Sequence, residues 1–469
     1  MSPIREGEAN DLAFATIQEL KGKLARGEVT SVELTELSLE RLGTIGTRLN
    51  AVATPMRESA LEDARRADAE RAAGKSRGPL HGIPYGAKDL LDTKGARTTW
   101  GSILYKDRVA QRDAAVVTRL RDAGAILVAK LAMVELAGGA GYRFASASLQ
   151  GPGKNPWNEG RWTGGSSSGS GAAVAAGLVP FAIGSETWGS IICPSSYCGV
   201  SGLRPTFGAI SRFGAMALCW SLDKLGPMAR SAEDLETIFG VLTGTDPRDP
   251  ATIHIAERIE PALHTLEIGV LPDSTWNGYQ PQAVAAMSAA LKVLEAQGHR
   301  LVPIKLPDQP FDALLLTILV SEAAAAFEPL IRSGRHLELI DPLSKIGLLP
   351  GTTVSAVDYI NAMRRRKLAA ADMAILFDTV DVIAGPSFPS VASPIEVNLE
   401  TWYALPTDPL GAPGNLCGLP GVSVPCGFGE EGLPLGITFM GPAAGASLVL
   451  TAAKSFQLAT DFHRRRPPV

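Results

Sequence analysis

The sequence predicts an α/β fold with a central mixed β-sheet that is covered by α-helices on both faces. From about residue 80 onward, short apolar segments of strand length alternate with longer segments of helical periodicity. No internal repeat and no long low-complexity linker divides the chain. The composition, 45% hydrophobic and 20% charged over 469 residues, supplies a large core and little surface charge. We therefore expect a single domain over residues 1–469.

The first 80 residues are expected to form helices around one short strand. Apolar residues at helical spacing predict a helix over residues 12–24, and Thr30 and Ser31 can cap a second helix that follows them. Residues 50–54 form a short extended segment. Residues 58–73 predict a charged amphipathic helix with a solvated face.

Strands and helices alternate in the remainder of the chain. A helix is expected over residues 115–123, and another over residues 282–297. The expected strands cover residues 126–129, 266–271, 301–304, 380–384, 422–425 and 435–440. Residues 310–370 are rich in helical pattern, and we expect them to form a mobile helical subregion that helps to bind substrate.

Charge and composition exclude several functional classes. Lys and Arg number 44 against 48 Asp and Glu, a net charge of −4, so no basic field is present for nucleic acid. No apolar run is long enough to span a membrane, and no signal peptide is visible. The five cysteines form no C-x-x-C pair, which indicates reduced thiols in a cytoplasmic protein. No metal-ligand spacing is present, so we expect neither a metal nor a cofactor.

Three segments carry residues suited to chemistry. Residues 164–171 read GGSSSGSG and open a helical run, a pattern that fits an anion site or an empty turn. Residues 186–190, ETWGS, follow an apolar strand. Residues 82–89, GIPYGAKD, place Lys88 at the end of another short strand.

Together these segments resemble the amidase signature family. The family combines a lysine in G-I-P-x-x-x-K-D, a G-G-S-S-G-type loop and a D-T-G-G-S-I-R-x-P turn. Further matches are C-G-V-S-G-L-R-P-T at residues 198–206, S-L-D-K-L-G-P-M-A-R at residues 221–230 and N-L-C-G-L-P-G-V-S-V-P at residues 415–425. The resemblance covers residues 13–460, in the order of the family's motifs.

The resemblance implies an amide hydrolase with a Ser–cis-Ser–Lys triad. Ser190 is then the nucleophile, Ser166 the bridging serine after a cis Gly165–Ser166 peptide bond, and Lys88 the base. A serine hydroxyl needs a base to become a good nucleophile, and a lysine serves only when burial keeps it neutral. The backbone N–H groups of Thr187, Trp188, Gly189 and Ser190 are the expected oxyanion hole.

The chain departs from the family beside the nucleophile. Glu186 replaces the usual Asp, Trp188 replaces the first Gly of the turn, and Ile192 replaces the usual Arg. The acid–arginine pair of the motif is therefore expected to be missing. The Trp188 indole should either point into the acyl pocket or fill the space of the absent arginine.

These features favour a serine hydrolase that cleaves a neutral amide, anilide or carbamate through an acyl-enzyme, with ester cleavage left open. Trp188 and the apolar residues 313–320 lean toward an apolar or aryl substrate. The expected partners are a small-molecule substrate and, at most, a second copy in a homodimer. The alternative is a glutamine-dependent amidotransferase A-type subunit that delivers ammonia to a partner. Residues 356–366 lack the L-S-x-G-Y-Y-D-A-Y-Y segment of that branch.

Three further interpretations are weaker. A G-x-S-x-G match at residues 165–169 would make Ser167 the nucleophile of an α/β-hydrolase, but no buried strand precedes it and the six histidines lie in no catalytic setting. Cys193 has no histidine partner in the pattern, so packing explains it better than thiol catalysis. A catalytically inactive scaffold conflicts with the presence of all three triad residues.

Overall fold

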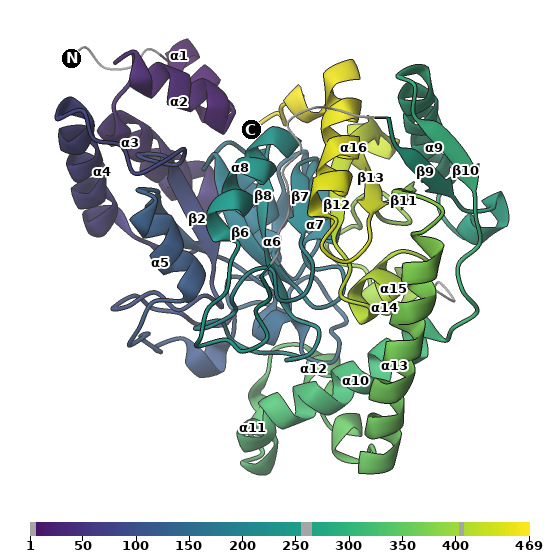
Figure 1. Ribbon diagram of the computed structural model, residues 1–469. Helices are drawn as coiled ribbons and strands as arrows, with labels where there is room; N and C mark the ends of the chain where they lie inside the picture. The colour runs from purple at the N-terminus through teal and green to yellow at the C-terminus, as the bar shows by residue number, and fades with distance from the viewer. Residues whose placement is uncertain (1–5, 255–264, 403–407) are drawn as a thin grey trace.

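The structure, a computed structural model, describes residues 6–254, 265–402 and 408–469. An 11-stranded sheet runs through its centre in the order β1-β3-β2-β6-β8-β7-β12-β13-β11-β9-β10 (Figure 1). Parallel and antiparallel neighbours both occur, since β2 pairs in parallel with β3 and β6 while β8 pairs antiparallel with β6 and β7. The predicted mixed α/β sheet is confirmed.

The central strands are apolar and buried. In β2, β6, β8, β11 and β13 every residue is buried, as expected of strands covered on both faces. The strands are β1 (Val52–Pro55), β2 (Pro84–Lys88), β3 (Ile126–Leu131), β4 (Lys154–Asn155), β5 (Asn158–Trp162), β6 (Phe181–Glu186), β7 (Ser201–Arg204), β8 (Lys224–Ala229), β9 (Glu267–Val270), β10 (Arg300–Pro303), β11 (Val382–Pro386), β12 (Gly421–Phe428) and β13 (Pro434–Met440).

Helices cover both faces of this sheet. On one face α8 and α16 pack together over β7, β8, β12 and β13, and on the other α6 and α7 do so over β2, β6, β7 and β13. The helices are α1 (Glu6–Ala13), α2 (Ile17–Ala25), α3 (Ser31–Arg41), α4 (Arg57–Ala72), α5 (Ala115–Asp122), α6 (Ser168–Ala175), α7 (Ile192–Cys198), α8 (Ala232–Leu242), α9 (Pro281–Ala296), α10 (Phe311–Ala326), α11 (Glu328–Arg332), α12 (Pro342–Gly347), α13 (Ala356–Leu376), α14 (Leu399–Trp402), α15 (Gly411–Leu416) and α16 (Ala446–Ala459).

The expected helix over residues 12–24 is two helices. The first helix ends at Ala13 and the second begins at Ile17, because Thr16 adopts an extended conformation and caps α2. Its side chain accepts from Glu19 N–H, and the Glu19 carboxylate accepts from Thr16 N–H, which satisfies donors at the helix start. The T-x-x-E pattern of a capping box is visible in the sequence and marks this start.

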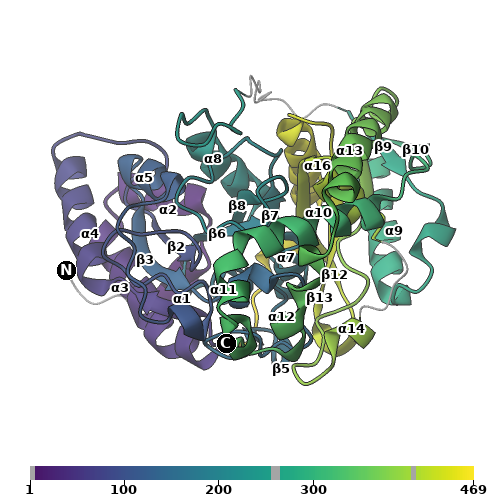
Figure 2. The same cartoon turned by 90° about the horizontal axis from the view of Figure 1, so that it is seen from below.

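Residues 310–370 are helical, as expected, and form the helices α10 to α12 with the first part of α13. They lie beyond one end of the sheet, at the bottom of Figure 1, and the view from below looks onto them (Figure 2). Their mobility and their role in substrate binding stay predictions, as does the single-domain organisation.

Candidate active site

Lys88 ends strand β2 and points into the protein. Its side chain is fully buried, and Nζ lies 2.8 Å from Ser166 Oγ, 2.9 Å from Ser167 Oγ and 2.9 Å from Ser185 Oγ. Because β2 and β6 run parallel as neighbours, Lys88 and Ser185 reach the same edge of the sheet, at the carboxyl ends of both strands. The lysine therefore sits in a cage of three serine hydroxyls.

The loop before α6 brings two of those serines. The peptide bond between Gly165 and Ser166 is cis, as the resemblance implies. A Cβ on Gly165 would lie 2.7 Å from Val134 Cγ2 and 2.8 Å from Trp162 Cζ2, so only glycine fits here. Ser166 is 1% exposed and Ser167 is fully buried.

Ser190 lies in the turn that joins β6 to α7. Its carbonyl oxygen accepts from Ser167 N–H at 3.3 Å, which ties this turn to the serine loop. Its side-chain hydroxyl hydrogen-bonds to none of the described residues. The structure thus brings Lys88 and Ser166 into direct contact and Ser190 into the adjoining turn, without a Ser190–Ser166 hydroxyl bond.

The predicted oxyanion donors lie in the same turn. Gly189 has a φ of +81°, a conformation that glycine adopts without strain. Over the described parts of the chain, the backbone N–H groups of Thr187, Trp188, Gly189 and Ser190 donate to no protein acceptor. Unpaired backbone donors beside a serine are suited to a developing oxyanion.

Burial controls the charge of Lys88. Desolvation lowers the pKa of Lys88 to about 7, although the carboxylates of Asp223 and Glu186 act in the opposite direction. A substantial neutral fraction therefore exists near pH 7, and a neutral amine can accept a proton.

A lysine base predicts a rising pH profile. As pH increases through about 7, Lys88 loses its proton and kcat/KM should rise, then level off. Initial rates between pH 5 and 9 on one substrate measure this. A profile that is flat or that falls with pH would contradict the assignment of Lys88 as the base.

Lys224 provides the control for this profile. It is also buried and desolvation also lowers its pKa to about 7, but its Nζ donates to the Leu222 carbonyl and to no serine in the described part of the chain. In Lys224→Met, kcat/KM should therefore still rise with pH near 7.

Glu186 is paired with an arginine after all. Arg204 Nη1 lies 3.0 Å from Glu186 Oε1, and the N–H groups of Ile191 and Ile192 donate to Oε2. Burial alone would raise the pKa of the Glu186 carboxyl, but Arg204 and these N–H groups outweigh it and lower the pKa. The expectation of a missing pair was wrong: β7 supplies the arginine, and the carboxylate holds the start of α7.

Breaking this pair should destabilise the protein. Arg204→Met leaves the Glu186 carboxylate buried without its cation, and we expect the free energy of unfolding to fall by about 3 kcal/mol. Urea unfolding measures it. Arg332→Met, which breaks an exposed pair with Glu328, should cost less than about 0.5 kcal/mol. Equal losses in both variants would contradict the role given to the buried pair.

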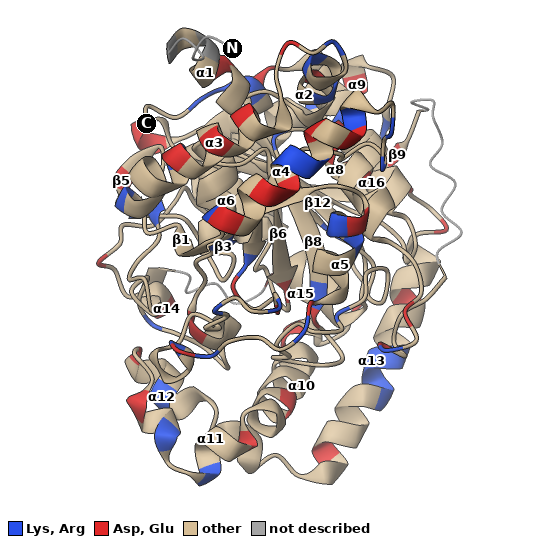
Figure 3. Cartoon of the chain, turned by 90° about the vertical axis from the view of Figure 1, so that its left-hand side faces the viewer, with Lys and Arg blue, Asp and Glu red and all other residues tan. Residues whose placement is uncertain are grey.

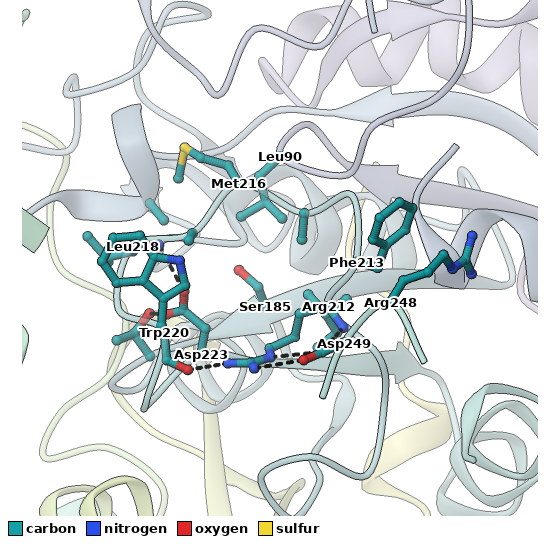
Figure 4. Close-up of a pocket in the computed structure, with 15 residues that line it drawn as sticks. Leu90, Ser185, Arg212, Phe213, Met216, Leu218, Trp220, Asp223, Arg248 and Asp249 are labelled. Carbon is teal, nitrogen blue, oxygen red and sulfur yellow. Dashed lines mark hydrogen bonds and ion pairs between the residues drawn. The ribbon is translucent and has the colours of Figure 1, made fainter. Parts of the chain in front are cut away.

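Two cavities flank the turn that carries Ser190. The first, of about 200 Å³, is reached from Ser185 and Thr187, and Figure 4 shows Ser185 between Trp220 and Arg212. The second, of about 330 Å³, lies beside Trp188, Gly189 and Ile192. Its further lining includes Tyr279, Asp312, Phe388, Asp408 and Leu410. Residues of this turn therefore line both cavities.

Trp188 is half-buried and lines the second cavity together with Ile192. Its Nε1 donates to Asp408 Oδ2 at 2.8 Å, and Asp408 Oδ1 accepts from Gly411 N–H. Desolvation raises the pKa of the Asp408 carboxyl. The indole thus takes up space at the cavity wall and occupies one oxygen of this acid.

Sequence reasoning missed three contributors. Ser167, which we considered only as the nucleophile of a weaker alternative, contacts Lys88 directly; Ser185 and Asp408 were not singled out. Ser185 could have been found, because it precedes Glu186 at the end of the strand parallel to that of Lys88. Asp408 carries no local signal, since it meets Trp188 across 220 positions of the chain.

Within the described residues, no group of three or more His, Cys, Asp or Glu is arranged to hold a metal ion. No helix there is long and apolar enough to cross a membrane.

The chain belongs to the amidase family, whose model matches residues 33–450. It is 38% identical to the A subunit of glutamyl-tRNA(Gln) amidotransferase from Roseiflexus sp. (strain RS-1), over 96% of this chain and 98% of that protein. The native peptide amidase of Stenotrophomonas maltophilia is 30% identical, with a TM-score of 0.85 over 97% of this chain and 98% of that one.

A third similar chain comes from a vestigial protein complex that reveals the evolutionary origins of an s-triazine catabolic enzyme. It is 33% identical, with a TM-score of 0.85 over 94% of this chain and 98% of that chain. These comparisons establish the amidase-signature fold and the family.

The comparisons correct one prediction. We expected no partner beyond a small-molecule substrate and a second copy of the chain. Relatives that match over nearly their whole length are named as the A subunits of an amidotransferase, and therefore work with other subunits. The expectation of a chain without protein partners is wrong.

Proposed function

We propose that this chain is the amide-cleaving subunit of an A-type amidotransferase complex and that Ser190, Ser166 and Lys88 carry out the reaction. The observation that carries the proposal is the contact of a fully buried lysine with Ser166 Oγ at 2.8 Å, beside a turn of unpaired N–H groups. The similarity to amidotransferase A subunits supports it.

The steps follow from the residue types. Ser190 Oγ attacks the amide carbon while its proton passes to Ser166, whose own proton passes to Lys88 Nζ. The N–H groups of the turn stabilise the oxyanion. Ser166 then protonates the departing nitrogen and takes a proton back from Lys88, so that the nitrogen leaves as ammonia or an amine and Lys88 is neutral again. Water attacks the acyl-enzyme while the same serine and lysine remove its proton, and this proton is returned to Ser190 as the acid is released.

Glutamine is the first amide donor to test. The A-type branch releases ammonia from glutamine for a partner protein, and the 38% identity over nearly the full length supports the same substrate here. Two cavities beside the turn leave room for the acyl group on one side and for the departing nitrogen on the other.

An apolar amide or anilide is the second candidate, and the second cavity favours it. Arg204, the one cation among the described residues that line this cavity, is engaged by Glu186, so no free cation faces the carboxylate of an amino acid there. Ile192, Phe388 and the Trp188 ring supply apolar walls instead.

A pair of substrates separates the candidates. Ammonia release from L-glutamine above the Ser190→Ala background supports the first, and aniline release from an acyl anilide without ammonia from glutamine supports the second. The absence of both products would contradict the proposed chemistry.

Trp188→Gly should change the preference between the two substrates. It removes an apolar wall, frees Asp408 and restores the glycine of the family turn. We expect the ratio of kcat/KM values to shift toward glutamine by about tenfold. Cys426→Ala, a small buried change on β12, should leave the ratio unchanged. An unchanged ratio in Trp188→Gly would remove Trp188 from substrate selection.

A further inference from the structure

One face of α13 carries a row of apolar side chains that stand in solvent. Val357, Ile360, Leu368 and Ile375 are 66%, 54%, 62% and 65% exposed. They are separated by 3, 8 and 7 residues, which places them on one side of the helix over about five turns. Single exposed apolar residues are ordinary, but several on one face of one helix are typical of an interaction site. We call these four residues the outer stripe.

The opposite side of α13 is fixed to the protein. Tyr359 OH donates to Glu322 Oε1 on α10 at 2.7 Å. Arg366 Nε donates to the Leu416 carbonyl at 2.6 Å, and its Nη2 donates to the Ser221 carbonyl at 2.9 Å. The helix is therefore held in one rotation, and its outer stripe faces away from the body.

The charge around the outer stripe is basic. Arg364 lies within the row, and Arg365 and Lys367 flank it, which gives the middle of α13 its blue band in Figure 3. The two acids of the helix lie toward its ends, where Asp358 Oδ2 accepts from Ser355 Oγ and Asp372 Oδ2 accepts from Gln309 Nε2, so the basic charge is concentrated at the middle of the row. A complementary surface must combine an apolar row with acidic flanks.

We propose that the outer stripe docks an amphipathic helix of a protein partner, with acidic residues on both sides of its apolar row. The proposal rests on the proposed function, which places this chain in a complex. Two packed helices bury such rows against one another, as in bundles. A second copy of the chain fits poorly, because antiparallel pairing of two α13 helices would bring both sets of Arg364, Arg365 and Lys367 together.

Docking on α13 would also affect the walls of the two cavities beside the Ser190 turn. Arg366 binds the carbonyl of Ser221, the neighbour of Trp220 at the first cavity. It also binds Leu416 at the end of α15, and Gly411 at the start of that helix lines the second cavity. The Arg366 side chain thus connects the helix on which the partner docks to segments that line both cavities.

The test uses the full chain and a fluorescent synthetic peptide with the 21-residue length of α13, leucines at every third or fourth position and glutamates beside them. Fluorescence anisotropy should show binding that weakens with salt. Leu368→Glu and Arg364→Glu should each weaken it at least about tenfold. Leu458→Glu, a change at a 73% exposed leucine on α16, should not. Unchanged thermal unfolding confirms that the variants fold.

Four results would overturn the proposal. These are equal binding of a peptide with lysines in place of the glutamates, unchanged binding by Leu368→Glu, a dimer of the wild-type chain that Leu368→Glu dissociates, and α13-dependent binding to vesicles of phosphatidylserine and phosphatidylcholine. Peptide binding is measured in Ser190→Ala as well. Because binding there needs no turnover, a failure of docking is distinguished from a failure of the proposed function.

Discussion

Replacing Ser190 by alanine should lower kcat by about 10⁴- to 10⁶-fold, the range seen when a nucleophilic serine is removed. The variant keeps the turn, because the Ser190 carbonyl, and not its hydroxyl, accepts the bond from Ser167 N–H. Steady-state rates on whichever amide the wild type cleaves measure the loss. Thermal unfolding of the variant should match that of the wild type.

Ser195→Ala is the matched control. Ser195 is a fully buried serine on α7, and its Oγ has no hydrogen-bond partner among the described residues. Its removal should leave kcat within about threefold of the wild-type value, because the loss of this hydroxyl changes the activation free energy by less than about 1 kcal/mol. A Ser190→Ala enzyme that retains most of its activity would exclude Ser190 as the nucleophile.

Replacing Lys88 by methionine should lower kcat by about 10²- to 10⁴-fold, the usual contribution of general base catalysis. Methionine fills similar space and removes a buried amine, so the fold should tolerate it. The remaining activity should no longer rise with pH near 7, because that rise reflects the pKa of Lys88. Single-turnover rates at several pH values measure both effects.

Comparison of Lys88→Met with Lys224→Met distinguishes a lysine that acts as a base from one that is only buried. The two lysines share burial and a pKa lowered to about 7, and they differ in that only Lys88 contacts the serines. Lys224→Met should therefore keep nearly all activity. Equal losses in the two variants would show that burial of positive charge beneath the site, and not base catalysis, explains the effect.

The sequence was sufficient to single out the candidate residues that lie within continuous motifs. Lys88, Ser166 and Ser190 stand in segments whose order and composition resemble the family, and the structure brings Lys88 and Ser166 into contact. The fold class followed from the alternation of strand and helix patterns. The order of the strands within the sheet could not be predicted, because β6, β8 and β7 are neighbours through pairings that no local pattern specifies.

Contacts across the sheet escaped prediction for the same reason. The glutamate at position 186 was visible, but its arginine partner arrives from β7, beyond β8, and is recognised only once the strands are ordered. The partner of Trp188, Asp408, lies just before α15, far along the chain. A protein partner was expected only in the amidotransferase alternative, because residues 356–366 lack the segment that is typical of that branch.

Trapping of the acyl-enzyme tests the central claim most directly. The protein is incubated with an activated aryl ester or a phenyl carbamate, its intact mass is recorded, and the adduct is mapped by peptide sequencing. We predict an acyl or carbamoyl group on Ser190 that is absent from Ser190→Ala. An adduct on another residue, such as Cys193 three positions further along, or an adduct that persists in Ser190→Ala, would contradict the account.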